Sequence, residues 1–127
     1  MRPVLLAVIC LVLGGCGTAD DRDQARAVTQ RFYDAVRADD GAAACLQLSQ
    51  ALAEEEGNRC ERDVTGLDVA DAEITSVEVY VTSAKVDTAG SGSAFLDRGP
   101  SGWKIAAAGC APGGKPASHP FDCELED

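Results

Sequence analysis

The sequence has little of what most catalytic and nucleic-acid-binding sites need. It contains one histidine, His119, and only three lysines among its eleven basic residues. The 21 acidic residues outnumber the basic ones and give a net charge of −10, which argues against binding to nucleic acid or to an anionic membrane through charge. The longest apolar run, residues 4–13, is too short to cross a bilayer as a permanent helix.

The N-terminus has the features of an export signal. Arg2 precedes the apolar run and small residues follow it. The segment Leu13-Gly14-Gly15-Cys16 resembles the lipobox of bacterial lipoproteins, in which an apolar residue and two small ones precede a lipidated cysteine. The resemblance implies that residues 1–15 are a lipoprotein signal peptide and that Cys16 carries a diacylglyceryl anchor. The alternatives are an ordinary signal peptide cleaved elsewhere and a short buried helix.

A lipidated Cys16 implies a location. The protein would be held at the extracytoplasmic face of the cell membrane, its membrane contact being the lipid. One acyl chain gives only marginal, reversible binding, so a stable anchor needs the two or three palmitate-like chains that such a cysteine carries. Residues 16–22 are polar and are predicted to form a short lipidated tether.

Four cysteines remain outside the signal and the lipobox: Cys45, Cys60, Cys110 and Cys123. An even number in a small exported domain predicts disulfides, with three connectivities open. The spacing favours the local pairs Cys45–Cys60 and Cys110–Cys123, each closing a loop that stabilises the domain by roughly 3 kcal/mol. The rival interpretation is a metal site, but the sequence has no C-x-x-C spacing, so we expect neither a metal nor another cofactor.

Residues 23–127 are long enough for one domain. Apolar residues at helical spacing predict a helix from residue 23 to about 38, a second over 42–55 and one or two further turns over 60–67. From residue 71 the apolar period changes to two, which predicts half-buried strands separated by Gly- and Pro-containing turns. The expected fold is therefore α+β, with N-terminal helices packed on an antiparallel sheet of about four strands.

The same patterns predict the core. The sheet is expected to bury one face against the helices. The expected sheet residues are Val77, Val79, Val86, Phe95, Trp103 and Ile105, and the expected helix residues are Val28, Phe32, Val36, Leu48 and Leu52.

Several short segments together resemble a group of small actinobacterial lipoproteins. They are Phe32-Tyr33, Gly41-Ala42-Ala43-Ala44-Cys45, Cys60, Ala94-Phe95-Leu96, Gly102-Trp103-Lys104-Ile105, Ala108-Gly109-Cys110 and Phe121-Asp122-Cys123. The group is similar in layout to the nuclear transport factor two-like (cystatin-like) cone. This resemblance implies that the N-terminal helices lie in the concavity of a curved antiparallel sheet, and it implies no activity.

Two motifs suggest chemistry but have simpler explanations. Residues 109–116 nearly match a phosphate-binding loop, yet Pro116 replaces the hydroxyl residue that would bind Mg²⁺, so a Gly/Pro-rich loop closed by a disulfide is favoured. Ser118 and His119 place a hydroxyl beside an imidazole, but catalytic triads are built from residues distant in sequence, so an exposed histidine is favoured.

Cone-shaped folds also house isomerases and cyclases, which place an acid–base Asp or His and a Tyr inside the cavity. The cavity candidates here are Tyr33, Asp34, Tyr80 and Asp87, but strand phase directs Tyr80 and Asp87 outward. Tyr33 is expected at the seam between helix and sheet, with its hydroxyl at the rim.

Trp103 is expected to anchor the core, and with Tyr33 it is a candidate cleft residue. We therefore expect that the chain has no catalytic residue. We expect a non-catalytic domain that binds a protein partner or a small apolar ligand. An isomerase- or cyclase-like enzyme is the alternative.

Overall fold

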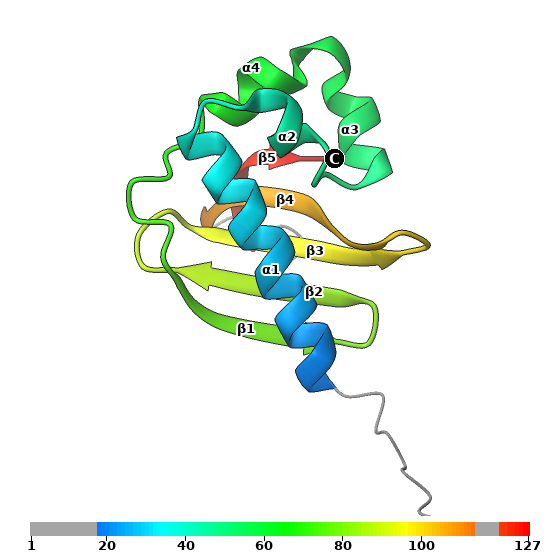
Figure 1. Ribbon diagram of the computed structural model, residues 1–127. Coiled ribbons are helices and arrows are strands. Elements are labelled where there is room, and N and C mark those ends of the chain that lie inside the picture. Colours follow the sequence, from blue (N-terminus) through cyan, green and yellow to red (C-terminus); the bar gives the residue numbers. More distant parts are fainter. Residues whose placement is uncertain (1–17, 114–119) are drawn as a thin grey trace, which may run out of the picture.

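A long helix lies across one face of an antiparallel sheet, and three shorter helices cover one end of the molecule (Figure 1). The computed structural model describes residues 18–113 and 120–127. The helices are α1 (Thr18–Arg37), α2 (Gly41–Cys45), α3 (Gln50–Glu56) and α4 (Cys60–Thr65), with a 3₁₀ turn at Gly57–Arg59. The strands are β1 (Ile74–Tyr80), β2 (Ser83–Thr88), β3 (Ser93–Gly99), β4 (Gly102–Pro112) and β5 (Phe121–Glu126).

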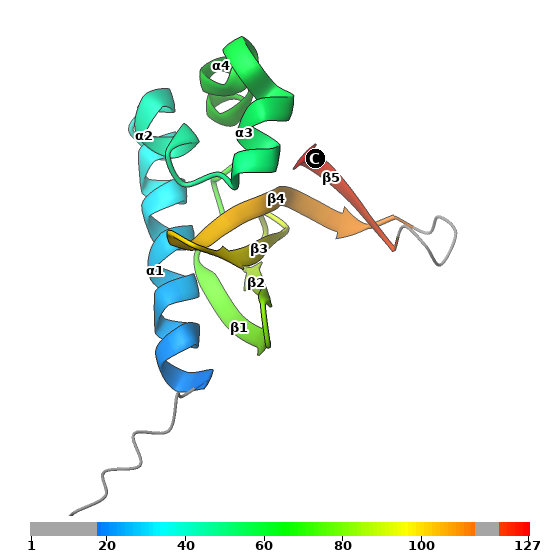
Figure 2. The ribbon, with the colours of Figure 1, turned by 90° about the vertical axis from the view of Figure 1, so that its right-hand side faces the viewer.

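The sheet is an open meander in which each strand pairs with the next along the chain, in the order β1-β2-β3-β4-β5. The α+β class and the antiparallel sheet are thus confirmed, but the sheet has five strands rather than about four. The additional strand, β5, falls in the tail that was expected to be a loop. It pairs with the end of β4, and the two strands project away from α1 (Figure 2).

The main core lies between α1 and the sheet. Phe32 on α1 and Val86, Leu96 and Ile105 on three different strands are completely buried. Val28 and Val36 extend the buried stripe of α1 at helical spacing, as the sequence predicts. The apolar face of α1 is therefore what fixes the helix on the sheet.

The first helix begins at Thr18, so the expectation of a tether through residue 22 is wrong for residues 18–22. Asp20 and Asp21 lie in its first turn, where carboxylates favour a helix N-terminus. Asp21 is also held by the side chains of Arg98 and Trp103. Contacts with the β3–β4 turn, which no local pattern reveals, thus extend the helix toward the N-terminus.

The second predicted helix is broken into α2 and α3. Between them, the Gln47 carbonyl accepts a hydrogen bond from the Ile105 amide, and the Ser49 amide donates to the Ile105 carbonyl. The Ser49 hydroxyl then caps α3 by accepting from the Leu52 amide. Pairing with β4 therefore interrupts a pattern that would otherwise form one helix.

One core prediction is wrong on the sheet. Phe95 is only half-buried and lies on the sheet face away from α1, where its ring packs edge-on against Phe121 at 5.1 Å between centroids. Its neighbours Ala94 and Leu96 face the core instead. Val81 is 89% exposed because β1 ends at Tyr80 and Val81 lies in the turn that follows.

Both local disulfides are present. Cys45–Cys60 ties the end of α2 to the start of α4, and Cys110–Cys123 joins directly opposed residues of β4 and β5. Among the described residues, no helix is long and apolar enough to cross a membrane.

Candidate functional site: a pocket beside Trp103

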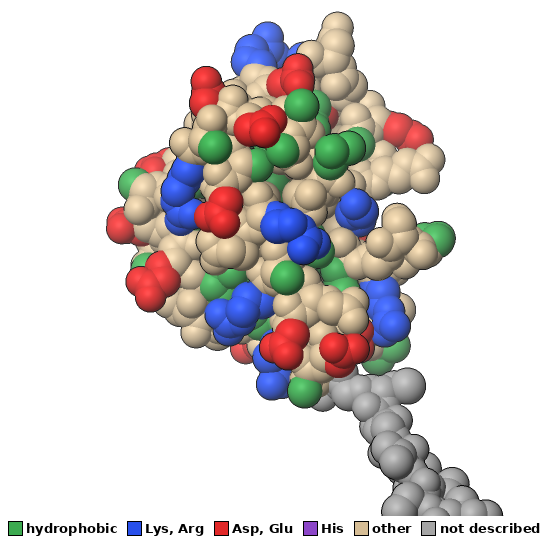
Figure 3. Space-filling model, viewed as in Figure 1, with side chains coloured by type: hydrophobic (Ala, Val, Ile, Leu, Met, Phe, Trp, Pro, Cys, Tyr) green, Lys and Arg blue, Asp and Glu red, His purple; other side chains and the backbone are tan. Residues whose placement is uncertain are grey.

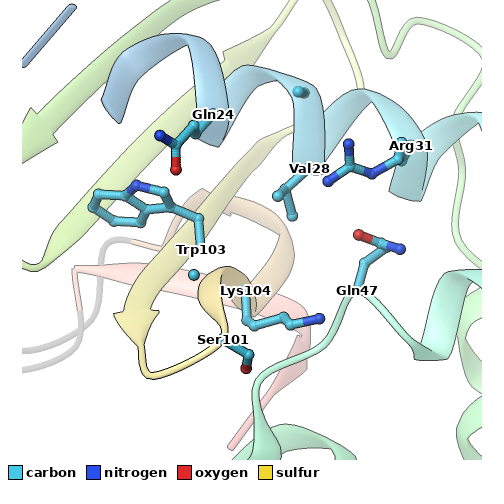
Figure 4. Close-up of a pocket in the computed structure, with 9 residues that line it drawn as sticks. Gln24, Val28, Arg31, Gln47, Ser101, Trp103 and Lys104 are labelled. Atoms are coloured by element: carbon cyan, nitrogen blue, oxygen red, sulfur yellow. The ribbon is translucent and has the colours of Figure 1, made fainter. Parts of the chain in front are cut away.

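A pocket of about 200 Å³ opens between α1 and the turn that joins β3 to β4 (Figure 4). Two cationic side chains, two amides, a hydroxyl and the Trp103 ring line it, and the lining contains no carboxylate. The lining residues are Gln24, Ala27, Val28, Arg31, Gln47, Ser101, Gly102, Trp103 and Lys104.

Three separate parts of the chain position these side chains. Gln24 and Arg31 project from α1, and Gln47 comes from the segment between α2 and α3. Ser101 lies in the β3–β4 turn, and Lys104 lies on β4. Gly102 permits this turn because its φ of +98° is disfavoured for residues with a side chain. The pocket thus exists only once the helix, the α2–α3 connection and the sheet have come together.

Trp103 fixes the wall of the pocket nearest the start of α1. Its side chain is 3% exposed, and its Nε1–H donates a hydrogen bond to Asp21 Oδ1 at 3.3 Å. The same carboxylate forms an ion pair with Arg98 at 3.2 Å. The indole is therefore anchored at both its ring and its polar edge, as a rigid surface beside the opening.

The two cationic side chains of the pocket, Lys104 and Arg31, differ in the polar contacts that they form. Lys104 Nζ donates to the backbone carbonyl of Leu46 at 2.9 Å. Arg31 is exposed and forms no ion pair with a carboxylate in the part of the chain that the structure describes. The pocket lining is cationic even though Figure 3 shows Lys and Arg side chains interspersed with Asp and Glu on the face that α1 covers, and the whole chain carries a net charge of −10. This arrangement favours a small anion over a cation.

The structure separates the two candidate cleft residues. Trp103 lines the pocket, whereas Tyr33 does not. The Tyr33 side chain is 1% exposed, and its hydroxyl has no hydrogen-bond partner among the described residues. Burial raises the pKa of Tyr33 to about 12, against a smaller lowering by Arg37. The expectation of a hydroxyl at the rim is wrong, because Tyr33 lies fully inside the core.

The other acid–base candidates lie apart from one another. On the sheet face away from α1, Asp87 accepts hydrogen bonds from the hydroxyls of Ser93 at 2.6 Å and Ser76 at 2.9 Å. The bond from Ser93 is the largest cause of a lowered pKa for Asp87. Tyr80 is 56% exposed and donates to Glu78 at 2.6 Å, which raises the pKa of its hydroxyl.

Asp34, the remaining candidate, forms an exposed ion pair with Arg37 at 3.0 Å. Asp34, Tyr80 and Asp87 are therefore held by different neighbours and do not converge on a common point.

Several predictions fall outside the described residues: the lipidation of Cys16, the Gly-Lys-Pro end of the loop at 114–116, and the pair Ser118 and His119. Within the described ranges, no group of three or more His, Cys, Asp or Glu side chains is placed to hold a metal ion.

Comparison with known proteins finds no matching family model, no matching curated protein and no matching solved structure. The geometry of the chain is therefore the guide to its function. Trp103 is predicted from the sequence as a cleft residue, whereas the other residues of the pocket are not. Gln24, Arg31 and Gln47 lie on polar helix faces or in a connection, where no motif distinguishes them from ordinary surface residues.

Proposed function

We propose that this chain is a lipid-anchored extracytoplasmic lipoprotein whose single domain binds a small ligand without catalysing a reaction. Two features of the sequence support the anchor: the short apolar run and the lipobox-like segment ending at Cys16. The two disulfides fit the same location, because such bonds persist in oxidising compartments outside the cytoplasm.

The observation that carries the non-catalytic part of the proposal is the filled space between α1 and the sheet. Phe32, Tyr33, Val86, Leu96 and Ile105 occupy it, each at most 1% exposed. In this proposal the fold is a cystatin-like cone whose interior is core. An isomerase or cyclase of that fold would need an open interior holding an acid–base group and a hydroxyl donor.

The ligand site in this proposal is the pocket beside Trp103, and its lining favours a small anion over the apolar ligand expected from the sequence. Arg31 and Lys104 supply positive charge, and Gln24 and Gln47 supply amide N–H donors. A volume of about 200 Å³ is below the range of most drug-sized sites, so the ligand should be a small carboxylate or phosphate.

Trp103 provides the readout for a binding test because it is the only tryptophan. We expect succinate and phosphate, but not glucose, to change its fluorescence saturably. Arg31→Gln should weaken anion binding roughly tenfold, because hydrogen bonds to charged groups are worth about 1.5 kcal/mol or more. Arg26→Gln is the matched control, since Arg26 is also exposed on α1 but does not line the pocket. Absence of any saturable response, or equal affinities for the two variants, would refute the site.

A further inference from the structure

Two of the most exposed large apolar side chains lie next to each other at the β1–β2 turn. Val81 is 89% exposed and Tyr80 is 56% exposed. The other such residue in the described part of the chain is Leu46, which is 71% exposed and follows α2. An exposed valine beside an exposed tyrosine at a hairpin tip is a protruding apolar point that the fold itself does not cover.

Hydrogen bonds connect this tip to the first turn of α1. The Arg98 amide donates to the Thr82 carbonyl at 2.8 Å, and Thr82 directly follows Val81. The Arg98 guanidinium in turn binds Asp21 on α1, with N–O distances of 3.2 and 3.3 Å. The tip and the start of α1 therefore lie at the same end of the molecule, the lower end in Figure 1.

This end of the molecule is close in sequence to Cys16, the proposed site of lipid attachment. Only Gly17 separates Cys16 from Thr18, where α1 begins. Two residues span at most about 7 Å, so a lipid on Cys16 would hold the start of α1 against the bilayer. The hairpin, which Arg98 links to the first turn of α1, would then lie beside the same surface.

We infer that the β1–β2 hairpin tip, Tyr80 and Val81, inserts into the headgroup region of the membrane to which Cys16 is anchored. The inference rests on the proposed lipid anchor and adds to it a defined orientation of the domain on the membrane. The occupant of this apolar tip is a lipid surface.

The chemistry of the tip suits shallow insertion. Tyrosine is favoured at the headgroup level because its ring is apolar and its hydroxyl is polar, and Val81 adds an aliphatic side chain beside it. The Tyr80 hydroxyl remains satisfied there because it donates to Glu78. Acidic and basic residues are mixed at this end, with Asp20 and Asp21 near Arg22 and Arg98, so insertion depends on apolar contact and not on net charge.

The test places a nitroxide at the tip and measures its depth. Val81→p-acetylphenylalanine, coupled through its ketone to a hydroxylamine nitroxide, avoids the disulfide cysteines. Leu46→p-acetylphenylalanine is the matched control, because Leu46 is similarly exposed but directly follows α2, which lies near the opposite end of α1 (Figure 1). The labelled mature chain, residues 16–127, is attached through its Cys16 thiol to a maleimide lipid in phosphatidylglycerol–phosphatidylethanolamine vesicles.

On attachment, the label at position 81 should become several-fold less accessible to a water-soluble nickel chelate and more accessible to oxygen, while the label at position 46 stays unchanged. If position 81 remains as accessible to the chelate as position 46, the inference is wrong. Chemical coupling separates this result from the anchor itself. Absence of acyl groups on protein purified from cells would refute natural lipidation, whereas the coupled chain still tests the orientation.

Discussion

Two buried side-chain oxygens, the Tyr33 hydroxyl and Glu56 Oε2, lack hydrogen-bond partners in the described part of the chain. Glu56, the last residue of α3, is 9% exposed although it ends a run of three consecutive acidic residues. Burial is the largest cause of its raised pKa, followed by a hydrogen bond shared with Asp63, whose own pKa is lowered by that bond. The stabilising contribution of a protonated Glu56 is therefore lost as the pH rises through its raised pKa.

Tyr33 gives a prediction at alkaline pH. Its pKa rises from an ordinary value of 10.0 to about 12 in the folded protein, so the folded state retains the proton longer than the unfolded state does. The free energy of unfolding therefore falls as the pH rises from about 10 to about 12, and this group contributes roughly 2–3 kcal/mol of that loss. Tyr33→Phe should lack this loss and should be about 1 kcal/mol more stable at pH 7, because it removes a buried hydroxyl without a partner.

Urea unfolding of the wild type and Tyr33→Phe at pH 7, 9 and 11 measures this effect, and the difference between the two proteins isolates Tyr33 from the other titrating groups. Parallel pH dependences, or a less stable variant at pH 7, would show that the hydroxyl has a favourable partner in solution.

Among the secondary-structure elements, the short helices α2 and α3 replace the single helix that the sequence predicts over residues 42–55. The Cys45–Cys60 disulfide stabilises the segment from α2 to α4. The segment between α2 and α4 contains α3 and the 3₁₀ turn, and the bond joins the two ends of that segment. Replacing both cysteines in Cys45→Ala/Cys60→Ala should lower the free energy of unfolding by about 3 kcal/mol, as expected for a closed loop of this length. A urea midpoint equal to that of the wild type would mean that the short helices hold the corner without the bond.

The sequence predicts elements well where their cause is local. Asp40 caps α2 by accepting a hydrogen bond from the Ala43 amide, and Gly57 ends α3 with a φ of +53°, both at positions that sequence signals indicate. The alternation of Ala84 and Val86 similarly marks the core face of β2.

Elements whose cause is distant in sequence could not be predicted. The break at Gln47–Ser49 depends on hydrogen bonds to Ile105, and β5 forms because its residues pair with β4 across a disulfide. Most of the pocket could not be predicted for the same reason, because its residues come together through contacts distant in sequence. Trp103 is identifiable in the sequence because it is a large aromatic residue at the start of a predicted strand. Arg31 and Gln47 acquire a role only through the tertiary contacts that bring them beside it.

In the whole molecule, α1 joins the proposed anchor to the proposed binding surface. The start of α1 leads directly from Cys16, the hairpin tip lies at that same end, and the pocket beside Trp103 opens on the flank of α1. A chain with net charge −10 would thus present a locally cationic pocket close to the membrane. Each part of this arrangement depends on where the chain is attached.

The most direct test is therefore the chemical state of Cys16 in a bacterium that processes lipoproteins. We predict that the mature N-terminal peptide begins at Cys16 and carries a diacylglyceryl group, that the wild type fractionates with membranes, and that Cys16→Ser does not. An N-terminal peptide without acyl mass, together with equal membrane association of the two proteins, would contradict this prediction.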